Sequence, residues 1–153
     1  MAAKFTAPYI YQSLNPDFRE IISATERKNS FMRYMGFVLT KIEPGYIEGE
    51  ALFTPDLQQQ DGMVHGGVIA TAADLVTGFA AYSMVGKGEK VVTSDLKVSY
   101  FNPGRGEKLF ARGWVIKPGK RLQYCEAEIY TIDKEEYKLI AKSFSIMAVI
   151  PVK

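Results

Sequence analysis

One segment constrains the fold of this 153-residue chain more than any other: VIATAADLVTGFAAYSM, residues 68–84. If the segment forms a helix, apolar side chains cover nearly every face, and a helix of that kind has to be buried on all sides. A chain of this length usually builds a single core, so the other elements must surround the helix. The segment therefore predicts one domain organised around a central helix.

The chain after residue 90 has the pattern of successive β-strands. In residues 91–101, apolar residues alternate with polar ones, Thr93 among the latter, which is the period of a strand with one buried face. The apolar members are Val92, Leu96, Val98 and Tyr100. Turn-forming residues divide the rest into three further strands, predicted at residues 108–117, 121–132 and 137–150. Because the turns are short, neighbouring strands should be antiparallel.

The chain before the central helix contributes a helix and a hairpin. Asn15 is a suitable N-cap, and the apolar residues that follow it have helical spacing. Residues 36–54 form two short strand-like runs around a Pro-Gly turn dipeptide. Residues 1–14 have no clear period and are predicted to form an arm that packs on the body or on a partner. Residues 15–153 are then a single α+β domain, in which an antiparallel sheet wraps a long central helix and an additional helix precedes it.

The composition excludes several classes of protein. The net charge of +2 is too small to indicate nucleic-acid binding, which needs a clustered basic face. One cysteine and one histidine make neither an internal disulfide nor the usual zinc site, so we expect no metal. No apolar run reaches the roughly 18 residues of a membrane span, and the first residues lack the apolar core of a secretion signal. We expect a cytoplasmic protein that binds neither membrane nor nucleic acid.

Asp74 is a lone carboxylate in the apolar helix and needs a reason to be there. Burying a polar group without a partner costs about 2 kcal/mol or more, and an ionised group costs more still. A hydrogen bond to nearby backbone or an ion pair with a lysine would be a structural reason, and a catalytic role is the alternative. The residues alone leave both open.

The start of the helix, His65-Gly66-Gly67, also has two interpretations. His65 could be a helix-entry residue, with the glycines allowing close packing of strand and helix. Two glycines in the first turn would equally leave N–H groups open at the positive end of a helix, where they could hold an oxyanion. His65 and Asp74 are nine residues apart, which is about 13 to 14 Å along the axis and on opposite faces. If both act on one substrate, they come from two subunits of a symmetric dimer.

The run QQDGMVHGG, residues 59–67, followed by Asp74, resembles the signature of hotdog-fold acyl-CoA thioesterases of the phenylacetate-degradation (PaaI-like) branch. The segment VVTSDLKVSYFNPG resembles the same family, and the similarity extends over about residues 31–150. The resemblance implies a hotdog fold, an acyl-CoA substrate, homodimers with composite active sites, and pairing of dimers into tetramers.

The resemblance also implies roles for individual residues. Asp74 would attack the thioester carbonyl or activate a water molecule. Gly66 would donate its N–H to the developing oxyanion, with Gly67 as a second candidate, and His65 would orient the loop or polarise the thioester. A thioester is already activated toward attack, so this chemistry needs no metal and no other cofactor.

The resemblance also bears on the roles of Thr93 and Gln59. Thr93 matches a position where a hydroxyl lies near the attacking water. Gln59 stands where this branch more often has asparagine; glutamine can still donate an amide N–H, but its longer side chain shifts the geometry.

Basic residues near turns are best explained as solvated charges. If some of them contact the phosphates of coenzyme A, the candidates are Lys120, Arg121 and Arg105.

Other functions fit the sequence less well. The chain has no Gly-x-Ser-x-Gly elbow, and Cys125 has no second histidine to activate it. A hydratase of the same fold requires a histidine and an acidic residue in a different loop pattern, which this sequence lacks. A non-catalytic protein that binds or senses acyl-CoA is the alternative function. The sequence leaves the acyl group open among aromatic, medium and long chains.

Overall fold

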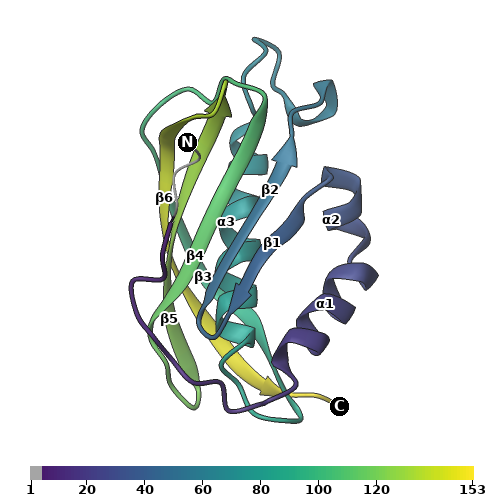
Figure 1. Ribbon diagram of the computed structural model, residues 1–153, viewed down its shortest axis with the longest axis vertical. Coiled ribbons are helices and arrows are strands. Elements are labelled where there is room, and N and C mark those ends of the chain that lie inside the picture. Colours follow the sequence, from purple (N-terminus) through teal and green to yellow (C-terminus); the bar gives the residue numbers. More distant parts are fainter. Residues whose placement is uncertain (1–4) are drawn as a thin grey trace.

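The computed structural model describes residues 5–153, which form one sheet and three α-helices (Figure 1). The elements in chain order are α1 (Phe18–Lys28), α2 (Ser30–Met35), β1 (Val38–Glu43), β2 (Tyr46–Leu52), the short 3₁₀ helix η1 (Pro55–Leu57), α3 (Gly66–Tyr82), β3 (Glu89–Tyr100), β4 (Lys108–Lys117), β5 (Leu122–Asp133) and β6 (Glu136–Pro151).

The sheet has six antiparallel strands in the order β1-β2-β4-β5-β6-β3, so β1 and β3 are its edges. Figure 1 shows the sheet curving around α3, with α1 and α2 beside the β1 edge. The expectation of an antiparallel sheet wrapped around a long central helix, with an additional helix before it, is confirmed. No helix within residues 5–153 is long and apolar enough to span a membrane.

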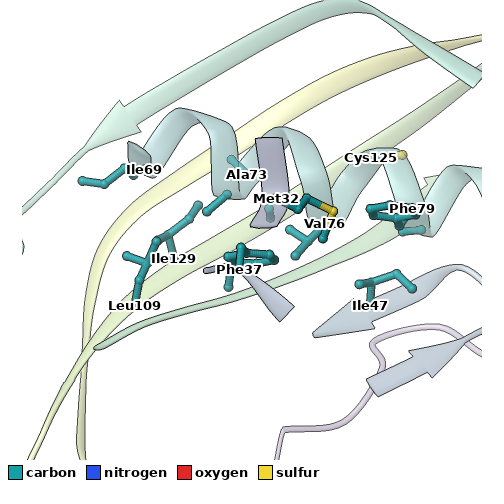
Figure 2. Packing of buried hydrophobic residues seen from close by; sticks show 14 of the residues in the cluster. Met32, Phe37, Ile47, Ile69, Ala73, Val76, Phe79, Leu109, Cys125 and Ile129 are labelled. Carbon is teal, nitrogen blue, oxygen red and sulfur yellow. The ribbon is translucent and has the colours of Figure 1, made fainter. Parts of the chain in front are cut away.

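Helix α3 is the centre of the core, as its apolar sequence requires. Its residues Ile69, Ala73, Val76 and Phe79 are buried against the sheet (Figure 2). The contact with β4 is close because Gly113 has no side chain: a Cβ there would lie 2.7 Å from the carbonyl carbon of Val76. The missing side chain of Gly113 therefore sets how closely β4 packs on the helix.

The start of the first helix was predicted too early. Asn15 does not cap it; the Asn15 side chain accepts a hydrogen bond from the Asp17 amide at 3.1 Å, which forms a turn ahead of the helix. The helix begins at Phe18. Helix α2 was not predicted, although Asn29 caps it by accepting from the Met32 amide at 3.1 Å. With six residues, α2 is too short to show a helical period.

The predicted alternation of β3 is interrupted at Ser94. The register with β6 shifts between Thr93 and Asp95, which makes Ser94 the extra residue of a β-bulge. A bulge reverses which side chains face which way, so Thr93 faces α3, while Val92 is 44% exposed. The placement of Thr93 on the face opposite to Leu96 was wrong for this reason.

The N-terminal arm, as far as residues 5–14 describe it, runs across the body of the domain. The Phe5 ring stacks on Phe110 of β4 with centroids 5.3 Å apart. Tyr11 donates its hydroxyl to the Ile116 carbonyl at 2.9 Å, and Ser13 donates to the Ser83 carbonyl at 2.6 Å. Residues 1–4 of the predicted arm lie outside the described residues.

Candidate active site

The first half of the candidate site is the start of α3. The His65 ring accepts a hydrogen bond from the Gly67 amide through Nδ1 at 2.9 Å, so His65 is the N-cap of the helix. This bond occupies the Gly67 N–H. The Gly66 N–H has no hydrogen-bond partner among residues 5–153, and the Tyr100 hydroxyl fixes the same residue by donating to the Gly66 carbonyl at 2.9 Å. Of the two glycines, Gly66 therefore offers the open donor.

The loop before the helix is held by its own hydrogen bonds. The Gln59 amide donates to the Met63 carbonyl at 2.8 Å, and the Gln59 side-chain oxygen accepts from the Asp61 amide. Because that oxygen is engaged, the side-chain NH₂ of Gln59 is the group left to meet a ligand. Gln59, Gly66 and Tyr100 line one cavity of about 360 Å³.

The second half of the site surrounds Asp74 in the middle of α3. The Thr93 hydroxyl donates to Asp74 Oδ1 at 2.6 Å, a short bond to a carboxylate of the kind that fixes a side chain firmly. Within residues 5–153, Asp74 forms no ion pair. An ion pair with a lysine, one structural reason considered for Asp74, is therefore absent from residues 5–153.

Asp74 and Thr93 line a cavity of about 410 Å³. Its walls come from α3, the first half of β3, the end of β6 and the α1–α2 segment, and they are mainly apolar. Gly78 lies one helical turn after Asp74, and a Cβ on it would meet nothing within 4 Å. Tyr82, one turn further, is at the far end of the same helix face.

These two halves do not meet within one chain. The cavity at Gly66 and the cavity at Asp74 share no lining residue. Gly66 and Asp74 are also separated by about 12 Å along the helix axis at 1.5 Å per residue. The geometry agrees with the expectation that His65 and Asp74 cannot act on one carbonyl from the same chain.

The three cations predicted to bind phosphate lie apart as well. Arg105 is exposed in the loop after Gly104, whose carbonyl accepts from the Val64 amide at 2.9 Å, so Arg105 is close to the Gly66 half. Lys120 and Arg121 are exposed in the turn between β4 and β5, and Lys120 lines a third cavity beyond the C-terminus of α3. No single patch contains all three.

Two contributors to the site were missed from the sequence. Tyr100 was assigned only to the apolar face of a strand, although it fixes Gly66. Gly78 could have been found, because a glycine in a helix interior is destabilising and this one lies four residues after Asp74.

Burial raises the pKa of the Cys125 thiol to about 12, so this cysteine is a packed core residue. Residues 5–153 contain no group of three or more His, Cys, Asp or Glu side chains that could hold a metal.

Comparison with known proteins places the chain in a family. Residues 61–138, half of the chain, match the family model of the thioesterase superfamily, and the chain belongs to this superfamily. It is 28% identical over 132 residues to human acyl-coenzyme A thioesterase 13, covering 85% of this chain and 92% of that protein. It is 25% identical over 103 residues to the proofreading thioesterase EntH of Klebsiella pneumoniae, covering 67% of this chain and 75% of that protein.

Solved structures agree with the hotdog fold that the resemblance implied. A thioesterase family protein from Silicibacter pomeroyi superposes with a TM-score of 0.86 at 27% identity, covering 88% of this chain and 98% of that chain. The E. coli PaaI protein superposes with a TM-score of 0.79 at 19% identity, over 92% of this chain and 100% of that chain, which shows the fold alone.

Proposed function

We propose that this protein hydrolyses acyl-CoA thioesters to a free acid and coenzyme A, in an active site composed of Asp74 from one protomer and Gly66 from its partner. The observation that carries the proposal is the Thr93–Asp74 hydrogen bond of 2.6 Å, which fixes a carboxylate in the wall of a mainly apolar cavity. The names of its relatives, which include an acyl-CoA thioesterase and a proofreading thioesterase, support the reaction class.

The edge strand β3 supports a dimer. Edge strands present unpaired backbone groups and pair readily with another chain. Three large apolar side chains on or next to β3, those of Val92, Tyr100 and Phe101, are 44%, 52% and 52% exposed. A second β3 strand, paired antiparallel about a two-fold axis, would complete the sheet and reduce this exposure.

The contacts of β3 suggest where that axis lies. Thr93 holds Asp74, and Tyr100, seven residues further along β3, holds Gly66. In an antiparallel pair, Thr93 lies opposite the Tyr100 of the partner when the axis passes through the position of Lys97, because the bulge at Ser94 leaves both residues three ladder positions from Lys97. Such a register brings the carboxylate of one protomer to the open N–H of the other.

In the proposed reaction, the carbonyl oxygen of the thioester lies against the Gly66 N–H at the positive end of α3. Asp74 takes a proton from water, the water oxygen attacks the carbonyl carbon, and the negative charge moves to the oxygen that Gly66 stabilises. The carbon–sulfur bond then breaks, and the proton held by Asp74 goes to the departing thiolate. Direct attack by Asp74, with hydrolysis of the resulting anhydride, is the alternative route. A donor of this kind to the oxyanion lowers the activation free energy by about 3 to 4 kcal/mol.

The remaining residues orient these groups. Thr93 keeps Asp74 Oδ1 fixed, which leaves Oδ2 for the proton. With Nδ1 accepting from Gly67, His65 carries its proton on Nε2 and can donate to the substrate. Gln59 lines the same cavity as Gly66, and its NH₂ group is proposed to donate to the thioester. Arg105, Lys120 and Arg121 are the proposed contacts for the coenzyme A phosphates; Arg105 is nearest to the Gly66 half.

Further parts of the proposal concern the assembly and its setting. We propose that dimers pair into tetramers, that the protein is cytoplasmic, and that the reaction uses no metal or other cofactor. Activity should then be unchanged after dialysis against EDTA. The first 14 residues are proposed as an arm and residues 15–153 as the catalytic domain.

The test is hydrolysis of a panel of acyl-CoA thioesters with detection of the released thiol, for the natural chain and for Asp74→Asn. The proposal expects turnover by the natural chain and a loss of at least about a hundredfold in kcat for the variant, with the dimer intact. Binding of acyl-CoA by the natural chain without turnover would instead support the alternative, a non-catalytic acyl-CoA-binding protein.

A further inference from the structure

The cavity of Asp74 extends in one direction only from the proposed catalytic carboxylate. On α3 it is lined by Asp74 and by residues after it, as far as Tyr82. On β3 it is lined by Thr93 and by residues before it, as far as Lys90. Because the Thr93 hydroxyl donates to Asp74 at 2.6 Å, both walls start at the same point. The carboxylate therefore lies at one end of the cavity, and the rest is open to the part of a substrate that does not react.

The two walls agree on the length of this cavity. Tyr82 lies eight residues after Asp74, which is about 12 Å along the helix axis at 1.5 Å per residue. Lys90 lies three residues before Thr93, which is about 10 Å along the strand. An extended acyl chain advances by about 1.25 Å per carbon, given a bond of about 1.52 Å and an angle of about 111°. About eight to ten carbons beyond the carbonyl carbon therefore span the cavity.

The lining of the cavity beyond Asp74 suits a hydrocarbon chain. Phe79 and Met147 belong to the buried core. On the α1–α2 wall, the Thr25 hydroxyl donates to a carbonyl of its own helix at 2.8 Å, and the Asn29 side-chain oxygen accepts from a backbone amide of α2 at 3.1 Å. Both polar side chains of that wall already have partners within the chain. An acyl chain without polar substituents buries apolar surface along this length and leaves no polar group of its own unpaired.

We propose that the substrates are straight-chain acyl-CoA thioesters of about 8 to 12 carbons, and that Tyr82 limits the length of the chain. This inference rests on the proposed thioesterase function and names its substrate class. The acyl chain runs from Asp74 past Gly78, and its methyl end lies against Tyr82. An acyl group with a single aromatic ring fills only the part of the cavity next to Asp74, and a palmitoyl chain is too long for it.

Hydrolysis of an even-numbered series from butanoyl-CoA to palmitoyl-CoA, together with phenylacetyl-CoA, tests the length. Each methylene buried in the cavity should raise kcat/KM by about fourfold, which corresponds to about 0.8 kcal/mol, up to a maximum near decanoyl-CoA. Palmitoyl-CoA and phenylacetyl-CoA should lie at least about tenfold below that maximum, because neither buries a chain of the right length. A series without a maximum, or with a maximum outside the range from octanoyl-CoA to dodecanoyl-CoA, would overturn the proposal.

Variants of Tyr82 test the end of the cavity. Tyr82→Ala removes the ring and should move the maximum to a chain longer by at least about two carbons. Tyr82→Leu, which keeps an apolar side chain of high helix propensity, should move it in the same direction and serves if Tyr82→Ala does not fold. Tyr82→Phe is the matched control: it keeps the ring, so the preferred length should stay the same. A maximum that does not move in the folded alanine or leucine variant would contradict the role of Tyr82.

Binding measurements separate this proposal from the thioesterase assignment. The S-butyl, S-decyl and S-hexadecyl thioethers of coenzyme A have no carbonyl group and cannot be hydrolysed as thioesters. Calorimetry on the natural chain should show the S-decyl compound binding most tightly. That preference without hydrolysis of any acyl-CoA would overturn the thioesterase assignment but not the chain length that the cavity takes. Hydrolysis at similar rates for every chain length, with equal binding of the three thioethers, would overturn the chain length and leave the thioesterase assignment standing.

Discussion

Gly78 provides a prediction in which stability and specificity change in opposite directions. It lies in the interior of α3, lines the Asp74 cavity, and would have nothing within 4 Å of an added Cβ. A glycine in a helix interior costs about 0.5 to 1 kcal/mol relative to alanine. We infer that this cost is tolerated because the missing side chain leaves room for the acyl group beside Asp74.

The first perturbation is Gly78→Ala, which should stabilise the protein by close to 1 kcal/mol. The entropy of unfolding for 153 residues is about 320 cal/mol/K at about 2.1 cal/mol/K per residue, so the thermal midpoint should rise by about 3 °C. Thermal unfolding followed by circular dichroism at equal protein concentration measures this.

The second perturbation is Gly78→Leu, which fills the space rather than only removing the glycine. Its four side-chain carbons can displace up to about four methylene groups of a bound acyl chain, at about 0.8 kcal/mol each. The resulting loss of about 3 kcal/mol corresponds to a decrease of about a hundredfold in kcat/KM for decanoyl-CoA. Acetyl-CoA, which does not reach Gly78, should be hydrolysed as before.

Gly78→Ala is the matched control, because it makes the same change to the backbone without filling the cavity. The reasoning is refuted if Gly78→Ala lowers the thermal midpoint, or if Gly78→Leu reduces the rates for acetyl-CoA and decanoyl-CoA by the same factor.

Three other predictions concern single side chains. Thr93→Val removes the donor to Asp74 and should lower kcat by about ten- to a hundredfold with little change in KM, whereas Thr93→Ser should retain most activity. Gly113→Ala places a Cβ 2.7 Å from the Val76 carbonyl carbon and should cost about 2 kcal/mol in urea unfolding; an unchanged midpoint would contradict the close packing of β4 on α3. Burial would raise the pKa of Glu128, but hydrogen bonds from Lys142, Tyr130 and Arg112 lower it from 4.5 to about 2. The lowered pKa of Glu128 contributes about 3 kcal/mol to the stability of the protein above pH 4.5, and this contribution is lost as the pH falls toward 2. Glu128→Gln should therefore be less stable than the natural chain at pH 7, and the difference should shrink between pH 4.5 and 2; a constant difference would contradict this.

Much of the fold is predictable because its signals are local. The apolar composition of α3 and the turns between β4, β5 and β6 are properties of neighbouring residues, and the observed bounds of these elements agree with prediction to within about two residues. The bulge at Ser94 is different, since it arises from pairing with β6 and the packing of α3. The turn at Asn15 likewise depends on the burial of that side chain, which is 5% exposed.

The site was predictable only in part, for related reasons. The spacing of His65 and Asp74 indicated that one chain does not bring them together, and the structure places Gly66 and Asp74 in separate cavities. The engagement of the Gly67 amide by His65 is a matter of local geometry that no sequence pattern shows. Tyr100 lies 34 residues after Gly66, so its contact could be found only once the fold had brought the two together.

Mixing two inactive variants tests the composite site most directly. Asp74→Ala lacks the carboxylate, and Gly66→Pro lacks the N–H donor. If each site takes Asp74 from one protomer and Gly66 from the other, a mixed dimer contains one intact site and one doubly defective site. Random reassembly of equal amounts makes about half of the dimers mixed, each with one of two sites intact, so about a quarter of the natural activity should return. If both residues served a site within one chain, every protomer in the mixture would be defective, and no activity would return although mixed dimers form.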